Sequence, residues 1–393
     1  MRRLFVLVAA VILVDTMFYA AVTPLLPQYA DELGLSKAAA GVLSASYAGG
    51  TLLGTFPAAW VAARLGVRTA VLGGLALMSV SGLVFAFADA VVVLDLARFG
   101  QGVGGALSWV GAFSWLVSAS PPDRRGEMIG SALAAAVFGL LLGPVLGGIA
   151  TVIGPEPVFS SAALLGAGLA LLAVGTRAPA PTSFPGWRRL GRAARVPAVV
   201  AGFWLVMLPA LFSGIINVLA PLRLDELGAS GVVIGIVFLV AALLEGAASP
   251  LFGRVADRRG RLWPIRLGLA LAALTALVLP IPQVVAVLGL TVVLADLVLG
   301  LCWTPAMAML SDAAERINVG QWFAFGLVNL AWAGGQVVGS SGGGSLAQTT
   351  ADAVPFALAA ALMGSTAAAI TLASRRGAIV LGAAARPAGQ RQA

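Results

Sequence analysis

The sequence predicts an all-helical membrane protein with twelve transmembrane helices in two six-helix halves. Three observations favour this fold class. Hydrophobic residues make up 60% of the 393-residue chain and charged residues only 10%, whereas about 25% of the residues of a soluble domain are charged. Twelve apolar segments follow one another along the chain, each near the ~20 residues that a helix needs to cross a bilayer. The two halves of the chain also resemble each other.

Each apolar segment is bounded by charged residues or by Pro and Gly, which is typical of membrane spans separated by short turns. In the first half the predicted spans are Leu4–Leu26, Ala39–Ala62, Thr69–Phe87, Val92–Val117, Met128–Ile149 and Val158–Val174. In the second half they are Pro197–Leu219, Val232–Phe252, Trp263–Leu279, Val284–Leu310, Gln321–Leu346 and Val354–Ala373.

The distribution of Lys and Arg predicts the orientation. With the N-terminus in the cytoplasm, nearly all of the 24 basic residues fall in cytoplasmic segments, as the positive-inside rule requires. The exceptions are Lys37 and Arg223 on the outside and Arg98 within a span. The N-terminal run also fits a signal peptide, but it continues beyond the usual length of a signal's apolar region. We therefore expect both termini in the cytoplasm and the protein in the plasma (inner) membrane.

An internal repeat at an offset of 194 residues indicates two related bundles. Asp31 corresponds to Asp225, and the same offset relates Gly41 to Gly235, Arg64 to Arg258 and Gly66 to Gly260. Six intervening spans preserve orientation, so this is a parallel repeat, a transporter architecture with the substrate site between the halves. We expect an N-terminal bundle (1–176), a cytoplasmic linker (177–196) rich in Pro and Arg, a C-terminal bundle (197–374) and a cytoplasmic tail (375–393).

The composition excludes several function classes. The chain has no His, and its single Cys302 lies in an apolar run, so neither a metal site nor a disulfide framework is expected. We expect no metal and no cofactor. The apolar composition excludes a nucleic-acid binder despite the net charge of +8, and the absence of a nucleophile motif argues against an enzyme.

A charged motif follows the predicted eighth span. The segment Gly253-Arg-Val-Ala-Asp257-Arg258-Arg-Gly260-Arg261 resembles the loop signature of the major facilitator superfamily. Its Gly residues permit a tight turn, and its carboxylate can pair with neighbouring Arg groups. The resemblance implies a conformational latch at the cytoplasmic mouth. In the first half Ala59 and Ala63 replace the corresponding Gly and Asp, so we expect a latch in the second half only.

Two further motifs strengthen the resemblance. In the fourth span, Arg98-x-x-Gln101-Gly-x-Gly resembles the family's R-x-x-Q-G-x-G motif, and Asp95 is the nearest candidate partner for the Arg in sequence. The fifth span matches the antiporter motif of the drug:proton exchange branch. Gly at these spacings favours close helix approach, and Pro144 favours a kink. The matching residues are Gly130, Gly139, Gly143, Pro144, Gly147 and Gly148, and the eleventh span repeats part of the pattern at Gly335, Gly339, Gly342 and Gly343.

Three acidic residues lie at membrane depth, which makes them functional candidates by default. Asp15 is in the first span, Glu245 in the eighth and Asp296 in the tenth. Removal from water favours the protonated form of a carboxylate, as a proton carrier needs. We predict that these acids, with Arg98, couple transport to protons; a structural hydrogen bond to a neighbouring helix is the alternative for each acid.

The resemblance covers nearly the whole chain, and the first span also looks like vesicular amine and bacterial multidrug exchangers. It implies a twelve-span drug:proton antiporter in which the first, fourth, seventh and tenth helices line a central cavity. The candidate wall residues are Tyr19, Gln101, Trp109, Trp115, Phe212, Asn217, Trp303 and, on the eleventh span, Asn329. The alternative for each aromatic residue is packing at the lipid interface.

The predicted function is proton-driven export of small amphipathic compounds by alternating access. Buried acids outnumber buried bases, which favours cationic or lipophilic substrates. The expected partners are a small-molecule substrate, protons and the lipid bilayer, and we expect a monomer. Two alternatives remain from the sequence: a proton-coupled importer of a sugar or metabolite, and a non-transporting membrane receptor.

Overall fold

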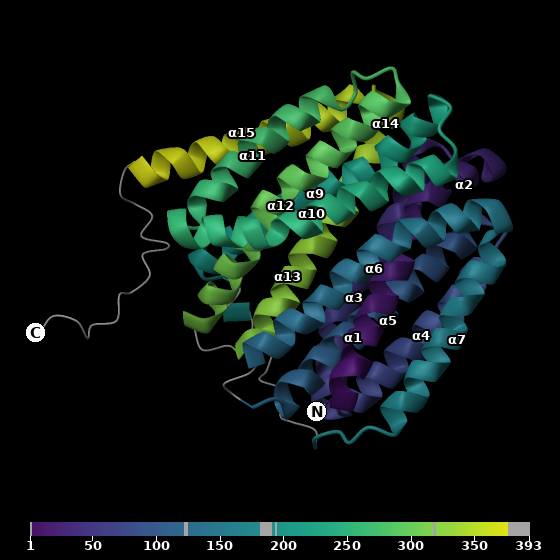
Figure 1. Ribbon diagram of the computed structural model, residues 1–393, viewed down its shortest axis with the longest axis vertical. Coiled ribbons are helices and arrows are strands. Elements are labelled where there is room, and N and C mark those ends of the chain that lie inside the picture. Colours follow the sequence, from purple (N-terminus) through teal and green to yellow (C-terminus); the bar gives the residue numbers. More distant parts are fainter. Residues whose placement is uncertain (1, 122–124, 181–190, 193–194, 317–319, 376–393) are drawn as a thin grey trace, which may run out of the picture.

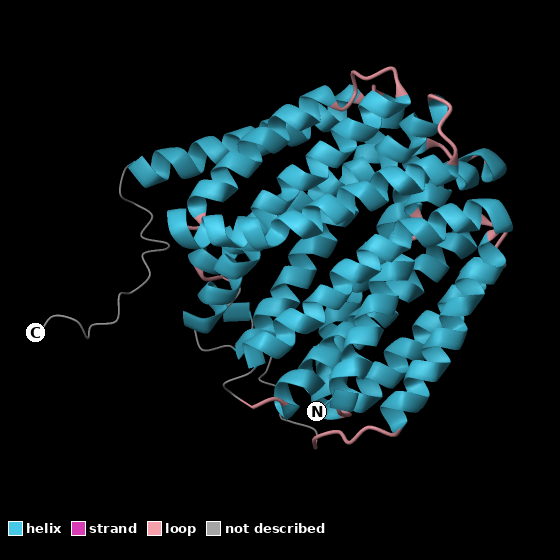
Figure 2. Ribbon diagram, viewed as in Figure 1, coloured by secondary structure: helices cyan, strands magenta, loops and turns pink. Residues whose placement is uncertain are grey.

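The computed structural model describes residues 2–121, 125–180, 191–192, 195–316 and 320–375. Within these residues every regular element is a helix (Figure 2). The first half contains α1 (Arg2–Ala20), η1 (Thr23–Leu25), α2 (Leu26–Leu33), α3 (Lys37–Arg64), α4 (Val67–Ala86), α5 (Val91–Ala119), α6 (Arg125–Ile153) and α7 (Pro155–Val174). The second half contains α9 (Pro197–Glu226), α10 (Gly231–Arg259), α11 (Leu262–Val278), α12 (Val285–Arg316), α13 (Gly320–Val337), η3 (Val338–Gly342), α14 (Gly343–Thr349) and α15 (Ala353–Arg375).

These helices confirm the predicted twelve spans. Among the described residues, nine helical rods are long and apolar enough to cross a membrane, including Arg2–Leu33, in which α1, η1 and α2 continue one another. The other three predicted spans correspond to α3, the shorter apolar α11, and α13 continued by η3 and α14. The chain is therefore a multi-pass membrane protein.

The helices form two bundles (Figure 1), and the bundles use equivalent contacts. In the first bundle α1 packs on α6, α3 on α5 and α4 on α7; in the second, α9 packs on α13, α10 on α12 and α11 on α15. The bundles meet along two seams, α6 against α10 and α3 against α13, η3 and α14. This arrangement is the one expected from the internal repeat.

The repeat extends to the backbone of the turns. Gly34 and Gly228 have positive φ angles of 63° and 90°, and they lie at the offset of 194 seen in the sequence. Ser36 and Ser230, at the same offset, each cap the next helix with a side chain that accepts a hydrogen bond from a backbone N–H. Such caps satisfy donors that a helix start leaves unpaired, so both halves start this helix in the same way.

Glycine brings the two seams into close contact. A side chain on Gly41 of α3 would meet the backbone of Ser340 and Gly344, and one on Gly235 of α10 would meet the carbonyl of Pro144 and the Cα of Gly148. Small residues allow helix backbones to approach closely in a membrane. The two seams are thus built alike, each from a glycine of one bundle against a small-residue face of the other.

The charged motif of the second half differs from the expected loop. Residues Gly253 to Arg259 form the last turns of α10, and only Gly260, with a φ of 80°, turns the chain. Arg258 is exposed, and Arg261 forms an ion pair with Asp312 of α12, in the same bundle. The side chain of Asp257 lies outside the described residues, as do most of the predicted linker and nearly all of the predicted tail.

Candidate functional site

Asp15 is a buried carboxylate held by two hydrogen bonds. Its side chain is 3% exposed on α1. The Tyr47 hydroxyl of α3 donates to Oδ1 at 2.7 Å, and the Trp109 indole N–H of α5 donates to Oδ2 at 2.6 Å. Gly105 leaves the space beside the carboxylate, because a side chain there would collide with Oδ1. These two donors fix the position of both carboxylate oxygens. The sequence indicated Asp15 and Trp109 but missed Tyr47.

Arg98 of α5 is 2% exposed, and Asp95 is not its partner, contrary to the sequence-based expectation. Its guanidinium donates to the Gln101 side chain at 2.9 Å and to the carbonyls of Phe18 at 3.4 Å and Tyr19 at 3.2 Å. These carbonyls belong to the last turn of α1, where a helix leaves its C=O groups without partners. Arg98 therefore ties α5 to the break between α1 and η1.

The ring faces of two tyrosines also surround this guanidinium. Its central carbon lies 5.0 Å from the centre of the Tyr47 ring and 5.9 Å from that of Tyr19. The Nε atom of Arg98 is buried and has no hydrogen-bond partner, and no ion pair between described residues includes Arg98. Carbonyl dipoles and aromatic rings contact the charge directly, and the Asp15 carboxylate acts on it electrostatically without forming an ion pair.

The other two predicted acids lie next to each other in the second bundle. Glu245 of α10 and Asp296 of α12 interact electrostatically, and both side chains are half-buried. The Cγ atom of Glu245 lies where a side chain on Gly300 would be, one helical turn beyond Asp296. In the first bundle Thr51 contacts Gly102 in the corresponding place, as the offset of 194 predicts for Thr51 and Glu245. The second bundle therefore carries an acid where the first carries a hydroxyl.

Tyr19 of α1 lies between the charged groups of the first bundle, Asp15 and Arg98, and those of the second bundle, Glu245 and Asp296. It lies within electrostatic range of Arg98 and Asp296 and within hydrogen-bonding range of the Asn217 side chain of α9. Its ring packs edge-on against Trp332 of α13, with centroids 5.2 Å apart. Tyr19, Arg98 and Asn217 also line a small cavity, with room for about one water molecule, between the bundles. Trp332 is a second contact residue that the sequence reasoning missed.

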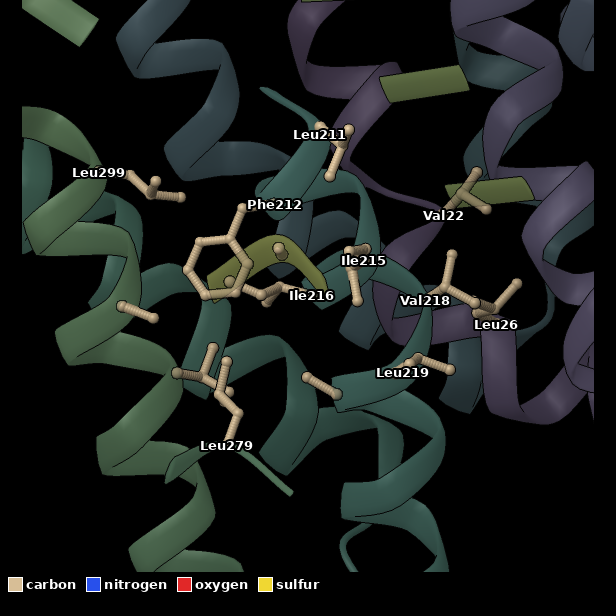
Figure 3. Packing of buried hydrophobic residues seen from close by; sticks show 14 of the residues in the cluster. Val22, Leu26, Leu211, Phe212, Ile215, Ile216, Val218, Leu219, Leu279 and Leu299 are labelled. Carbon is tan, nitrogen blue, oxygen red and sulfur yellow. The ribbon is translucent and has the colours of Figure 1, made fainter. Parts of the chain in front are cut away.

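The remaining predicted wall residues divide into two groups. Gln101 bonds Arg98, and Trp303 and Asn329 are half-buried. Trp115 and Phe212, in contrast, are fully buried, Trp115 in an apolar cluster of the first bundle and Phe212 in one that extends over both bundles. The Trp115 indole donates to the Arg177 carbonyl at 3.1 Å, and Figure 3 shows Phe212 among core side chains. Both side chains are therefore packed among apolar residues in this conformation, and their place in the wall of a transport cavity stays a prediction.

The glycines of the fifth-span motif face mainly the first helix of their own bundle. A side chain on Gly139 would meet Thr16 of α1, one on Gly143 would meet Ala20 at the end of α1, and one on Gly147 would meet Ala21 directly after it. Gly148 and the Pro144 carbonyl instead face α10, in the other bundle. Gly130 has open space around it. The motif therefore places α6 between α1 and α10.

The two bundles are joined at one end by Lys37, at the start of α3. Its Nζ lies 2.7 Å from Oδ2 of Asp352 and 3.5 Å from Oε1 of Glu226, both in the second bundle. Its backbone N–H donates to the Gln348 side chain at 3.0 Å. Val22 and Leu26 belong to the same apolar core cluster as residues of α9, such as Val218, beside this end (Figure 3). We call this the Lys37 end.

Replacing Lys37 with Met should loosen the Lys37 end. Half-exposed ion pairs stabilise by at most about 1 kcal/mol, so we expect an approximately fivefold shift in the population in which this end is open. The reporter is a thiol at Ser44, which lies 3.5 Å from Ser340 across the seam, in a Cys302→Ala background. Maleimide labelling of this thiol should rise in the variant.

The matched control is Glu32→Gln, because Glu32 is exposed and bonds Gln28 within its own helix. This control should label like the parent. Equal labelling of the Lys37→Met variant and the parent would mean that the ion pairs do not hold the bundles together.

Comparison with families of known proteins gives one match over most of the chain. The family model described as Major Facilitator Superfamily matches residues 8–222 and 202–382. The two matched ranges together extend over both bundles.

Several curated relatives match parts of the chain. An MFS-type transporter ppzB of Metarhizium rileyi is 38% identical over 33% of this chain and 27% of its own length. The human synaptic vesicular amine transporter is 24% identical over 72% of this chain and 57% of its own length. The quinolone resistance protein NorA of Staphylococcus aureus is 30% identical over 37% of each chain. The chain thus matches between about a quarter and somewhat over half of the length of these relatives.

Solved structures share the fold. A D-xylose-proton symporter superposes with a TM-score of 0.73 at 16% identity, over 93% of this chain and 95% of that one. A POT family transporter superposes with a TM-score of 0.74 at 15% identity, over 95% and 96% of the two chains. At this identity the likeness concerns the fold alone.

Proposed function

The chain belongs to the major facilitator superfamily, and from this premise we propose that it exports small amphipathic, cationic or lipophilic compounds in exchange for protons. The observation that carries the proposal is the set of three acids, Asp15, Glu245 and Asp296, on helices that flank the bundle interface. None of the ion pairs between described side chains includes any of them. Arg98 lies within electrostatic range of Asp15 but forms no ion pair with it. Acids at membrane depth that no ion pair occupies are suited to bind protons or cations.

Proton and cationic substrate are exchanged because they compete for the same carboxylates. A carboxylate that has bound a proton cannot also pair with an ammonium group, so proton and cationic substrate displace each other. Asp15 is already oriented by Tyr47 and Trp109, whereas Glu245 and Asp296 are adjacent and share one environment. Two ionised carboxylates side by side repel each other, so a proton or a cationic group bound to either of them relieves the repulsion. Tyr19 and Arg98 lie between Asp15 and the pair formed by Glu245 and Asp296, so that a change of charge at one site affects the other.

The distribution of basic residues supports an orientation with both termini in the cytoplasm. In this orientation the Lys37 end faces outwards, and its contacts between Lys37 and Asp352 and between Gly41 and Gly344 close the outer mouth. The conformation is then one with the outer side sealed. Rocking of the bundles about the central acids would open this end and release the substrate.

Two relatives support the substrate class. The human relative is described as an amine transporter and the staphylococcal relative as a quinolone resistance protein. Amines are cationic at neutral pH and suit a site rich in carboxylates. The carboxylate-rich centre and the complete fifth-span motif both favour export of such compounds over uptake of a sugar.

Transport by purified protein in vesicles with an imposed pH gradient tests the proposal. With ethidium as the probe, a gradient that drives protons in from the outer side should drive ethidium out, and a pH dye should report proton flow only when the probe is present. Movement of probe and protons in the same direction would identify an importer. Absence of movement for a panel of lipophilic cations and amines, with no proton flow, would contradict transport of this class.

Glu245→Gln is expected to reduce proton-driven export at least tenfold while the melting temperature of the protein stays near that of the parent. The reason is that an amide cannot exchange the proton that the pair with Asp296 shares. The control is Asp95→Asn, which also neutralises a half-buried acid in a span but lies apart from this pair. If instead the melting temperature falls and coupling survives, Glu245 is a structural residue.

A further inference from the structure

A second cavity lies at the Lys37 end of the second bundle, separate from the central acids. Its volume is about 220 Å³, more than the roughly 150 Å³ of an engineered protein cavity that binds benzene. Buried apolar side chains form its walls, and Leu219 and Leu279 are labelled in Figure 3. The apolar walls are Leu219 and Ala220 of α9, Leu279 and Pro280 beyond α11, Leu288 of α12 and Phe356 of α15.

Two charged side chains complete the lining, and one of them joins the bundles. Asp352 accepts from the Lys37 ammonium at 2.8 Å and 2.7 Å, and its side chain is 30% exposed. Arg223 donates to Glu226 at 2.8 Å and to Gln283 at 2.7 Å. The positive charge of Arg223 is therefore matched by its own neighbour, whereas Asp352 depends on a lysine from the other bundle.

The charge around this end favours a cation. The turns and helix ends of the Lys37 end contain only two basic residues, Lys37 and Arg223, while the acidic residues outnumber them: Asp31, Glu32, Asp89, Glu156, Asp225, Glu226 and Asp352. An excess of negative charge raises the local concentration of cations. An apolar cavity with a carboxylate at its mouth suits a small molecule with an apolar body and one ammonium group.

We propose that this cavity binds a small amphipathic amine, whose ammonium group bonds Asp352 in competition with Lys37. Occupancy removes a contact that holds the two bundles together, so the ligand favours opening of the Lys37 end. The site is distinct from the central exchange site: it shares no residue with Asp15, Glu245 or Asp296. It makes the protein responsive to amines present on that side of the membrane.

Titration of benzylamine into the full chain in lipid nanodiscs tests the site, with empty nanodiscs as the blank. Ala220→Phe fills the cavity and should weaken binding at least tenfold, and Leu288→Phe repeats the test should the first variant fail to fold. Asp352→Asn should also weaken binding. Lys37→Met should tighten it severalfold, because the competing ammonium is gone. Benzyl alcohol, with the same ring and no charge, should bind more weakly than benzylamine to the parent.

A second measurement tests whether an amine bound in the cavity opens the Lys37 end. In the parent, benzylamine should raise maleimide labelling at Ser44→Cys, and in Ala220→Phe it should not. Unchanged affinity in a folded Ala220→Phe or Leu288→Phe variant, or in Lys37→Met, overturns the proposal, as does absence of binding to the parent. Binding that disappears in Asp296→Asn but persists in Ala220→Phe places benzylamine at the central acids instead. That result would overturn the cavity site and leave the proposed export function intact.

Discussion

Proton-driven export should fall to background when Asp15 is replaced by Asn, while the protein inserts and folds like the parent. The hydrogen bonds of Asp15 explain why this substitution should remove proton exchange without unfolding the protein. The amide oxygen of Asn accepts from the Trp109 indole as Oδ2 of Asp15 does now, and its NH₂ group donates to the Tyr47 hydroxyl, which can turn to accept. Both hydrogen bonds persist, but the group can no longer take up or release a proton.

The measurement is ethidium export by vesicles under an imposed pH gradient, together with the melting temperature. Tyr47→Phe is the matched control: it removes one donor and keeps the carboxylate, so export should be reduced but present. Export at the parental rate in Asp15→Asn would show that Asp15 carries no proton, leaving Glu245 and Asp296 as the exchange site. A large fall in melting temperature would assign Asp15 a structural role.

Gly143→Leu is expected to abolish export and to lower the melting temperature. A side chain at this position meets the Ala20 side chain and the Met17 carbonyl of α1, and overpacking of this kind costs about 1–3 kcal/mol in protein cores. The helix that carries Asp15 would be pushed away from α6. Displacement of α1 also moves the Phe18 and Tyr19 carbonyls that hold Arg98, so the central site is disturbed as well.

The control comes from the same motif and uses the same substitution. Gly130 lies on α6 with nothing near the position of an added side chain, so Gly130→Leu should export and melt like the parent. Equal damage from both substitutions would mean that the motif acts through something other than contact with α1. Parental export in Gly143→Leu would show that close packing of α1 on α6 is not needed for exchange.

Much of the fold was predictable because local patterns determine it. Apolar length predicts the spans, and the offset of 194 predicts equivalent bundles down to the capping serines Ser36 and Ser230. The charged motif after the eighth span is expected in a loop because it resembles the loop signature of the family. Helix α10 instead continues to Arg259, since Arg is a good helix former and a polar helix end is stable outside the bilayer.

The sequence singles out candidate site residues but does not give the contacts that these residues make. Burial depth indicates Asp15, but its partner Tyr47 comes from a different helix and has no fixed spacing to it. Sequence proximity suggested Asp95 for Arg98, whereas the long side chain reaches the unpaired carbonyls at the end of α1. Such partners depend on where helices end and how they pack, and these are tertiary properties.

For the predicted cavity-wall residues, too, the sequence does not give the tertiary contacts. Knowing which helix lines a cavity does not say which side of the helix faces it. In this conformation Trp115 and Phe212 pack in apolar clusters, while Trp332, on a helix from which only Asn329 was predicted, contacts Tyr19. The glycines of α6 likewise predicted a close contact without naming α1 as the helix that makes it.

Lys37 is the only lysine in the chain, and its amine is held between Asp352 and Glu226. An amine must reach an acylating reagent in order to attack it, and the Lys37 side chain is only 28% exposed beside these two carboxylates while the bundles are joined. Separation of the bundles exposes the one side-chain amine of the molecule. An acetyl group added at that moment removes the positive charge, and the contact cannot form again. Acylation would therefore record the first opening of each molecule and, like Lys37→Met, shift that molecule about fivefold towards the open state.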